Sequence, residues 1–180
     1  MDAGASLRLA AAADGEEDTA NAVVAASGAG VLAGIARHPQ RRAAMEVVER
    51  VEVTRQHGIA GDGRGTVRPG GTGKRQVTLM ERGDWQAALD EIGASIPWEE
   101  RRVNLLVDGL DLPQTPGVRL RIGADVLLAV TCECDPCRRM DDLAPGLQAA
   151  MRPDWRGGVC ARVLMGGTIA VGDAIGIEQS

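Results

Sequence analysis

Hydrophobic and polar positions alternate, wholly or in part, in several short segments of this chain, and the alternation predicts short β-strands. VLAGIAR (31–37) and MEVVERVEVT (45–54) carry β-branched residues in partial alternation, which is typical of half-buried strands. Four further strands are predicted at RQVTLM (75–80), RRVNLLV (101–107), VRLRI (118–122) and DVLLAVT (125–131). The final pair, GGVCARVLM and TIAVGDAIGIE, is separated by Gly166-Gly167 and predicts a closing hairpin.

Two segments have the pattern of helices instead. The first has a single apolar stripe at helical spacing, formed by Trp85, Ala88, Leu89 and Ile92. Asp84 is the predicted N-cap of this helix, and Gly93 is the predicted stop. The second helix is predicted for residues 145–151, because PGLQAAM begins with a proline suited to a first turn.

Roughly eight strands and two helices, without alternating β and α units, predict a mainly β barrel. Gly123 and Gly172 each interrupt a strand close to an aspartate, as expected where a strand bends at a barrel corner. The segment 57–75 holds seven glycines in nineteen residues, so we expect a long functional loop there. Residues 1–27 are small, polar and acidic and predict a mobile tail, which leaves 28–180 as the domain.

Composition excludes several classes of function. The chain has three Trp, no Phe or Tyr, and a net charge of −5, so we expect no nucleic-acid partner. Lys74 is the single lysine, which makes pyridoxal-phosphate chemistry improbable. The first residues do not form a signal peptide, and residues 20–36 are too weakly apolar to span a bilayer. We therefore expect a cytoplasmic protein without a membrane partner.

The segment CECDPCRRM (132–140) holds three of the four cysteines. Because Pro136 fixes its own backbone, Cys137 is expected just after a rigid turn that can display a thiol. Three hypotheses fit the spacing: buried small hydrophobic residues, a functional thiol, or a structural zinc site. The zinc ligands would be Cys132, Cys134 and Cys137, with Cys160 or His57 as the fourth.

Six segments in order resemble the MOSC domain, the family named for the carboxy-terminal domain of molybdenum cofactor sulfurases. They are GIAGDGRG (58–65), RQVTL (75–79), RRVNLLVDGLDL (101–112), GVRLRIGADVLLAVT (117–131), DPCRRM (135–140) and RGGVCARVLMGGTIAVGD (156–173). The resemblance covers residues 31 to 177 and implies a β-barrel. It also implies that Cys137 is the characteristic thiol, which in relatives carries sulfur as a persulfide or binds the molybdenum of a pterin cofactor.

Further site residues follow from the same resemblance. Arg102 and Asn104 match the Arg-x-Asn pattern that helps hold the pterin and its phosphate in cofactor-binding relatives. Arg138, beside the thiol, is a second candidate contact for an anion, and Asp62 matches the family's Gly-Asp loop. This chain departs from the family at Gly63, where relatives often have a histidine. It also lacks the large pyridoxal-phosphate domain of full sulfurases, so we expect a stand-alone domain.

Three functions remain open. In the first, the protein binds molybdenum cofactor through Cys137 and reduces N-hydroxylated or N-oxide compounds, with electrons from a partner protein. In the second, Cys137 is a sulfur carrier that receives a persulfide from a separate desulfurase. In the third, the cysteines bind zinc in a non-catalytic module, and Cys132 and Cys134 matter as much as Cys137.

Overall fold

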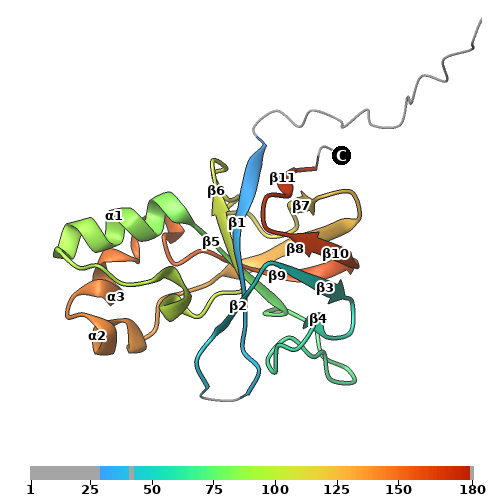
Figure 1. The fold of residues 1–180 in the computed structure, drawn as a ribbon, viewed down its shortest axis with the longest axis horizontal. Coiled ribbons are helices and arrows are strands. Elements are labelled where there is room, and N and C mark those ends of the chain that lie inside the picture. Colours follow the sequence, from blue (N-terminus) through green and yellow to red (C-terminus); the bar gives the residue numbers. More distant parts are fainter. Residues whose placement is uncertain (1–28, 41–42, 179–180) are drawn as a thin grey trace, which may run out of the picture.

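The computed structural model describes residues 29–40 and 43–178, so the predicted tail at 1–27 lies outside the described residues. The described part forms eleven strands, three α-helices and two 3₁₀ helices (Figure 1). The strands are β1 (Gly30–Arg37), β2 (Glu46–Val48), β3 (Arg50–Thr54), β4 (Gly58–Ile59), β5 (Val77–Glu81), β6 (Leu105–Asp108), β7 (Arg119–Ile122), β8 (Val126–Glu133), β9 (Val159–Met165), β10 (Gly167–Ala170) and β11 (Ala174–Ile177). The helices are α1 (Arg82–Ile92), η1 (Trp98–Arg101), α2 (Arg139–Leu143), α3 (Leu147–Ala150) and η2 (Pro153–Trp155).

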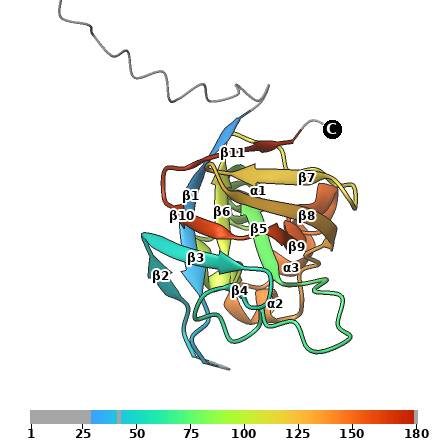
Figure 2. The ribbon, with the colours of Figure 1, turned by 90° about the vertical axis from the view of Figure 1, so that its right-hand side faces the viewer.

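Seven strands close into a barrel, in the order β1, β11, β7, β8, β9, β5, β6 and back to β1. β2 extends the sheet beside β1, while β10, β3 and β4 form a small second sheet (Figure 2). The barrel interior is filled by aliphatic side chains such as Leu32, Ile35, Leu79 and Leu105, none of which is exposed. The mainly β barrel predicted from the sequence is confirmed.

The predicted closing hairpin is wrong. β9 already has β8 on one edge and β5 on the other, so no edge of β9 is free to pair with β10. The chain turns at Gly166, where an added Cβ would lie 2.5 Å from the carbonyl oxygen of Val53. β10 consequently pairs with β3, from Gly167 opposite Val53 to Ala170 opposite Arg50.

Two predicted strands are also divided or shortened. The segment 45–54 breaks at Glu49 into β2, which pairs with β1, and β3, which pairs with β10. The strand predicted for 101–107 begins only at Leu105, because Arg102 has a left-handed backbone with a φ of 66°. That conformation is incompatible with an extended strand.

A single βαβ unit contradicts the expectation that β and α units do not alternate. β5 and β6 are parallel neighbours, with Leu79 opposite Leu105, and α1 lies in the connection between them. Parallel neighbours require such a crossover, which a pattern of separate short strands does not reveal. The predicted stripe is confirmed at Trp85 and Leu89, and Gly93 ends the helix with a φ of 65°.

The predicted N-cap of α1 is wrong. The helix begins at Arg82 with Glu81 as the N-cap residue, and no side chain caps it. Glu81 lies at the end of β5, and its Oε1 accepts a hydrogen bond of 2.6 Å from the amide of Leu112. A half-buried carboxyl group that accepts a hydrogen bond from a distant loop replaces the local cap that Asp84 would have provided.

The helices lie together on one side of the barrel (Figure 1). α3 falls within the predicted helix 145–151, whereas α2 was not predicted. A second core lies between the helices and the outer face of the barrel, formed by Met80, Trp85, Ala88, Leu89, Val103, Leu106, Cys134, Met140, Leu147, Ala150, Met151 and Cys160. The segment that leads out of β8 into α2 therefore crosses from the barrel to this helical layer.

We expect Glu81→Gln to stabilise the protein at alkaline pH. Burial raises the pKa of Glu81 to about 7, although the Leu112 amide acts in the opposite direction. A carboxyl group with a raised pKa in the folded state stabilises the fold below its unfolded pKa, and that contribution is lost as pH rises through about 4.5 to 7. Gln keeps the acceptor for Leu112 without a charge, so unfolding in urea should require roughly 1–3 kcal/mol more at pH 8 and about the same at pH 4.

The exposed Glu52 on β3 offers a matched control. Glu52→Gln should leave the pH dependence of unfolding unchanged. An unaltered pH profile in Glu81→Gln would contradict the assignment of this dependence to Glu81.

Candidate functional site

Cys137 is displayed on a turn between β8 and α2. β8 ends at Glu133, and the amide of Cys134 donates a hydrogen bond of 2.8 Å to the carbonyl of Gly158. Pro136 is buried, and Cys137 is exposed, as expected for a thiol displayed after a proline turn. The carbonyl of Cys137 accepts a hydrogen bond of 2.9 Å from the amide of Met140, which leads the chain into α2.

Arg101 fixes this turn from beneath. Its guanidinium is buried, and Nη2 donates to the carbonyl oxygens of Cys134 at 2.6 Å and Gly157 at 2.8 Å. The turn also approaches Gly157 closely, since an added Cβ there would lie 2.5 Å from the carbonyl oxygen of Cys134. The position of the exposed thiol is thus determined by a buried cation and by a glycine without room for a side chain.

The other three cysteines lie deeper. Cys134 and Cys160 are buried in the second core and Cys132 is partly buried, which agrees with the burial hypothesis for Cys134 and Cys160. Within residues 29–40 and 43–178, no three His, Cys, Asp or Glu side chains are grouped so as to hold a metal ion. The zinc site that was one of three hypotheses for the cysteine spacing is therefore not formed by these residues, and His57 lies exposed on the glycine-rich loop.

Asp62 is the centre of a buried hydrogen-bond network next to the carboxyl-terminal end of β1. Its carboxylate accepts bonds from Asn104 Nδ2 at 2.6 Å, the Arg64 amide at 2.7 Å and the His38 amide at 3.2 Å. These donors come from three separate segments of the chain. Asp62 therefore joins the glycine-rich loop to the end of β1 and to the segment that precedes β6.

Asn104 is fully engaged within the protein. Its Oδ1 accepts from the amide and hydroxyl of Thr78 at 3.1 and 2.9 Å, and Nδ2 also donates to the carbonyl of Ala36 at 3.3 Å. With only 4% of its surface exposed, Asn104 acts on the site by orienting Asp62. Its predicted role in holding a cofactor remains a prediction.

Arg102 faces a polar pocket of about 190 Å³ at the surface. The pocket is lined by Ala43, Ala44, Met45, Glu99, Glu100, Arg102 and Arg139. Burial lowers the pKa of Arg102, and the positive charges of Arg139 and Arg64 lower it further. Arg64 also donates from Nη2 to the carbonyl of Arg102 at 3.0 Å. Three guanidinium groups therefore gather here, an arrangement suited to an anionic group.

His38 belongs to the same region and was not predicted from the sequence. It follows β1, is 2% exposed, and neither ring nitrogen has a hydrogen-bond partner. Burial lowers the pKa of His38, and the charges of Arg102 and Arg64 act in the same direction, so the ring is neutral at pH 7. A neutral imidazole offers one donor and one acceptor. The available sequence signal was a histidine where an alternating strand ends at a proline.

A search with protein-family models matches residues 56–176 to the MOSC domain. The chain belongs to the MOSC domain family. The match covers Asp62, Arg102, Asn104, Cys137 and Arg138. The family as a whole is associated with molybdenum cofactor binding. No curated protein matches the chain.

Solved structures share the fold of this MOSC domain. The YuaD protein from Bacillus subtilis is 19% identical with a TM-score of 0.67, covering 82% of this chain and 94% of that one. YiiM from Geobacillus stearothermophilus is 17% identical with a TM-score of 0.65, covering 83% and 75%. YiiM from Escherichia coli is 16% identical with a TM-score of 0.57, covering 83% and 70%.

Arg139, rather than Arg138, lines the pocket of this MOSC domain. Arg138 is exposed immediately before α2, and its carbonyl accepts bonds from the amides that begin the helix. Arg139 lies one residue further on, where its guanidinium is 3.6 Å from the carboxylate of Glu100. Arg139 is the first residue of α2 and is two residues after Cys137. The start of α2 therefore lies between the exposed thiol and the pocket lined by Arg102 and Arg139, called the arginine pocket below.

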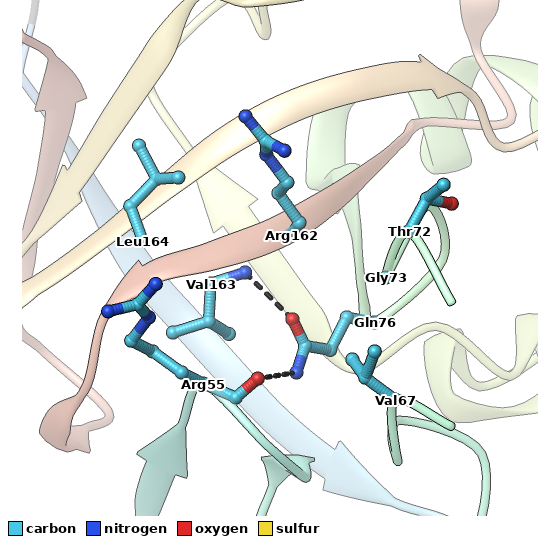
Figure 3. Close-up of a pocket in the computed structure, with 8 residues that line it drawn as sticks. All are labelled: Arg55, Val67, Thr72, Gly73, Gln76, Arg162, Val163 and Leu164. Atoms are coloured by element: carbon cyan, nitrogen blue, oxygen red, sulfur yellow. Dashed lines mark hydrogen bonds between the residues drawn. The ribbon is translucent and has the colours of Figure 1, made fainter. Parts of the chain in front are cut away.

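A second pocket of about 270 Å³ lies beside the glycine-rich loop, lined by Arg55, Val67, Thr72, Gly73, Gln76, Arg162, Val163 and Leu164 (Figure 3). The side chain of Gln76 links two other lining residues, because it donates to the carbonyl of Arg55 at 2.8 Å and accepts from the amide of Val163 at 2.9 Å. Val67, Thr72 and Gly73 belong to the loop that the sequence predicts to be functional, whereas no individual candidate site residue lines this pocket. No helix in the part of the MOSC domain that the structure describes has the length and apolarity needed to cross a membrane.

We expect Arg102→Gly to weaken anion binding without loss of stability. A left-handed non-glycine residue costs about 1–2 kcal/mol, and the unfolded-state entropy of Gly offsets part of the gain. The free energy of unfolding should therefore stay constant or rise by up to about 1 kcal/mol. Inorganic phosphate should raise the melting temperature of the unmodified protein, and this increase should disappear in Arg102→Gly. Arg102→Ala retains the strain, so equal stability of the Ala and Gly variants would contradict this explanation.

Proposed function

We propose that this MOSC domain binds molybdenum cofactor with Cys137 as the protein ligand of the metal, and that its substrates are N-hydroxylated or N-oxide compounds. The observation that carries the proposal is the exposed thiol of Cys137 on a fixed turn, two residues before Arg139, which lines a polar pocket together with Arg102. Family membership supports the same function.

The residues present fit such a group. A thiolate is a soft ligand of the kind that binds transition metals, and planar guanidinium groups suit the phosphate of a pterin. Arg64, Arg102 and Arg139 gather here, and the carboxylates of Asp62, Glu99 and Glu100 offset part of their charge. The unpartnered ring of His38 supplies a further donor, and leaving it without a ligand would cost about 1–3 kcal/mol.

The protein's own residues would bind and orient. Cys137 would hold the metal, Arg102 and Arg139 would hold the anionic end of the cofactor, and His38 would donate one hydrogen bond. Arg101 and Asp62 act indirectly, since Arg101 fixes the thiol turn and Asp62 fixes the loop that carries Arg64. When bound, the cofactor supplies the redox chemistry. Electrons would come from a partner protein, and the reduced thiol fits a cytoplasmic location.

Elemental analysis tests the proposal. The protein is purified from a host that makes molybdenum cofactor, and molybdenum is measured per chain, with zinc as the comparison metal. We expect molybdenum near one atom per chain. Absence of molybdenum from protein purified under these conditions would overturn the proposal.

A sulfur carrier is the second candidate, and the exposure of Cys137 is the observation that favours it. A thiolate at an accessible turn is sufficient to accept a persulfide from a desulfurase. Incubation with a cysteine desulfurase and cysteine, followed by mass spectrometry, should then show one added sulfur atom on Cys137. Lack of the adduct with donor in excess would exclude this function.

A further inference from the structure

Arg75 lies beside the buried thiol of Cys134. The pKa of Arg75 is raised, against the effect of burial, by the negative charges of nearby cysteine thiolates: Cys160, Cys134, Cys132 and Cys137. Its Nη2 lies 3.7 Å from the Sγ of Cys134, and Nη2 of Arg101 lies 3.6 Å from the same sulfur. Cys134 is only 2% exposed. The guanidinium groups of Arg75 and Arg101 therefore both contact one buried thiol.

Cys160 completes the arrangement. It is fully buried on β9, and its sulfur lies 3.5 Å from the carbonyl oxygen of Glu133, the residue before Cys134. The amide of Cys134 donates to the carbonyl of Gly158, two residues before Cys160, so the two buried thiols are neighbours across β8 and β9. The neighbouring Cys160 thiol lowers the pKa of Cys134, and Arg101 and Arg75 lower it further against the effect of burial. The pKa of Cys160 is raised by Cys134 and by burial. Of the two thiols, Cys134 therefore loses its proton more readily.

This pair has no part in the proposed cofactor site, which uses Cys137. Its chemistry is that of a nucleophilic thiolate beside a resolving thiol. We propose that Cys134 and Cys160 form a reversible dithiol–disulfide site, with Cys134 as the nucleophile and hydrogen peroxide as the oxidant. The inference is independent of the cofactor.

The chemistry balances in two steps. The Cys134 thiolate attacks one oxygen of the peroxide, the O–O bond breaks, and the leaving hydroxide takes up a proton to give water and a Cys134 sulfenic acid. Cys160 then loses its proton and attacks the Cys134 sulfur, the S–O bond breaks, and a second water leaves as the disulfide forms. Two thiols are oxidised by two electrons and the peroxide is reduced to water.

Oxidation would also act on the turn that carries Cys137. Arg101 contacts both the sulfur and the carbonyl oxygen of Cys134, so loss of the thiolate removes part of what holds its guanidinium in place. The Nε of Arg101 is buried without a partner, which leaves the thiolate as an important electrostatic contact. The redox state of the pair is thereby coupled to the position of Cys137.

The experiment uses the full chain, reduced and then treated with hydrogen peroxide, followed by blocking of free thiols and peptide mapping. We expect a loss of two free thiols, a mass decrease of two hydrogen atoms, and one cross-linked peptide joining Cys134 to Cys160. Dithiothreitol should reverse all three changes. A cross-link through Cys132, which lies opposite Cys160 in the strand register, or through Cys137 would overturn the proposal, as would the absence of any cross-link.

Variants separate the roles. Cys160→Ala should stop at a Cys134 sulfenic acid that a 1,3-diketone reagent traps, and Cys137→Ser should still form the disulfide. Arg75→Gln, at an exposed position, should slow disulfide formation roughly 2- to 10-fold at pH 7, because less of Cys134 is thiolate. Arg75→Lys should recover part of the rate. Unchanged rates in Arg75→Gln would contradict the role of Cys134 as the nucleophile, and the peptide map of the unmodified chain decides the pairing even if Cys160→Ala does not fold.

Discussion

Cys137→Ser is expected to lose at least about 10-fold of its bound molybdenum while the fold remains intact. The thiol is exposed and contributes no packing, so the free energy of unfolding should change by less than about 0.5 kcal/mol. A hydroxyl group is a poor replacement for a soft thiolate ligand, and the arginine pocket alone would hold the cofactor only through its anionic end. Metal analysis and urea unfolding of the same preparations measure both quantities.

Cys132 offers the matched control for this substitution. It lies five residues earlier at the end of β8, partly buried against the second core, and outside the proposed cofactor site. Cys132→Ser should retain its molybdenum. Equal loss from both variants would show that the cysteines act as a group, and the assignment of a single ligand to Cys137 would then be wrong.

Gly158→Ala should produce the largest loss of stability, at least about 3 kcal/mol. Gly158 has a φ of 92°, and an added Cβ would lie 2.0 Å from the carbonyl oxygen of Leu79 and 3.0 Å from the Cα of Met80. Both atoms are backbone atoms of the barrel strand β5, so they cannot move aside as a side chain could. Because the carbonyl of Gly158 also bonds the amide of Cys134, the thiol turn should loosen with the strand.

Gly83, in the first turn of α1, provides the comparison. A Cβ there would meet nothing within 4 Å, and its backbone is helical. Gly83→Ala should therefore raise the free energy of unfolding by up to about 1 kcal/mol, since Ala favours a helix over Gly. Urea unfolding of the two variants checks both signs. A Gly158→Ala variant as stable as Gly83→Ala would contradict the described packing of β9 on β5.

The alternation of apolar and polar residues was sufficient to predict a mainly β barrel, and the apolar stripe was sufficient to predict α1. Both patterns depend on local burial periodicity. Which strands pair could not be predicted in the same way. β5 and β6 are parallel neighbours through a crossover, and β10 leaves β9 because both edges of β9 are occupied. The predicted N-cap of α1 was wrong for a related reason, since the carboxyl group of Glu81 accepts a hydrogen bond from the distant amide of Leu112.

The site was predictable only in part. A proline before Cys137 was a local signal for a displayed thiol, and the structure places that thiol on the surface. Arg139 had no local signal, and His38 had only its place where an alternating strand ends at a proline, because their role depends on the end of β1 and the start of α2 meeting around Arg102. The sequence also could not show that the side-chain amide of Asn104 forms hydrogen bonds within the protein, to Thr78, Ala36 and Asp62.

The central claim is that Cys137 supplies a sulfur ligand to the metal of a bound cofactor. X-ray absorption spectroscopy at the molybdenum edge, on the cofactor-loaded protein and on Cys137→Ser reconstituted with excess cofactor, tests it most directly. The account predicts one sulfur neighbour fewer around molybdenum in the variant, with Cys132→Ser identical to the unmodified protein. The same number of sulfur neighbours in the unmodified protein and in Cys137→Ser would contradict it.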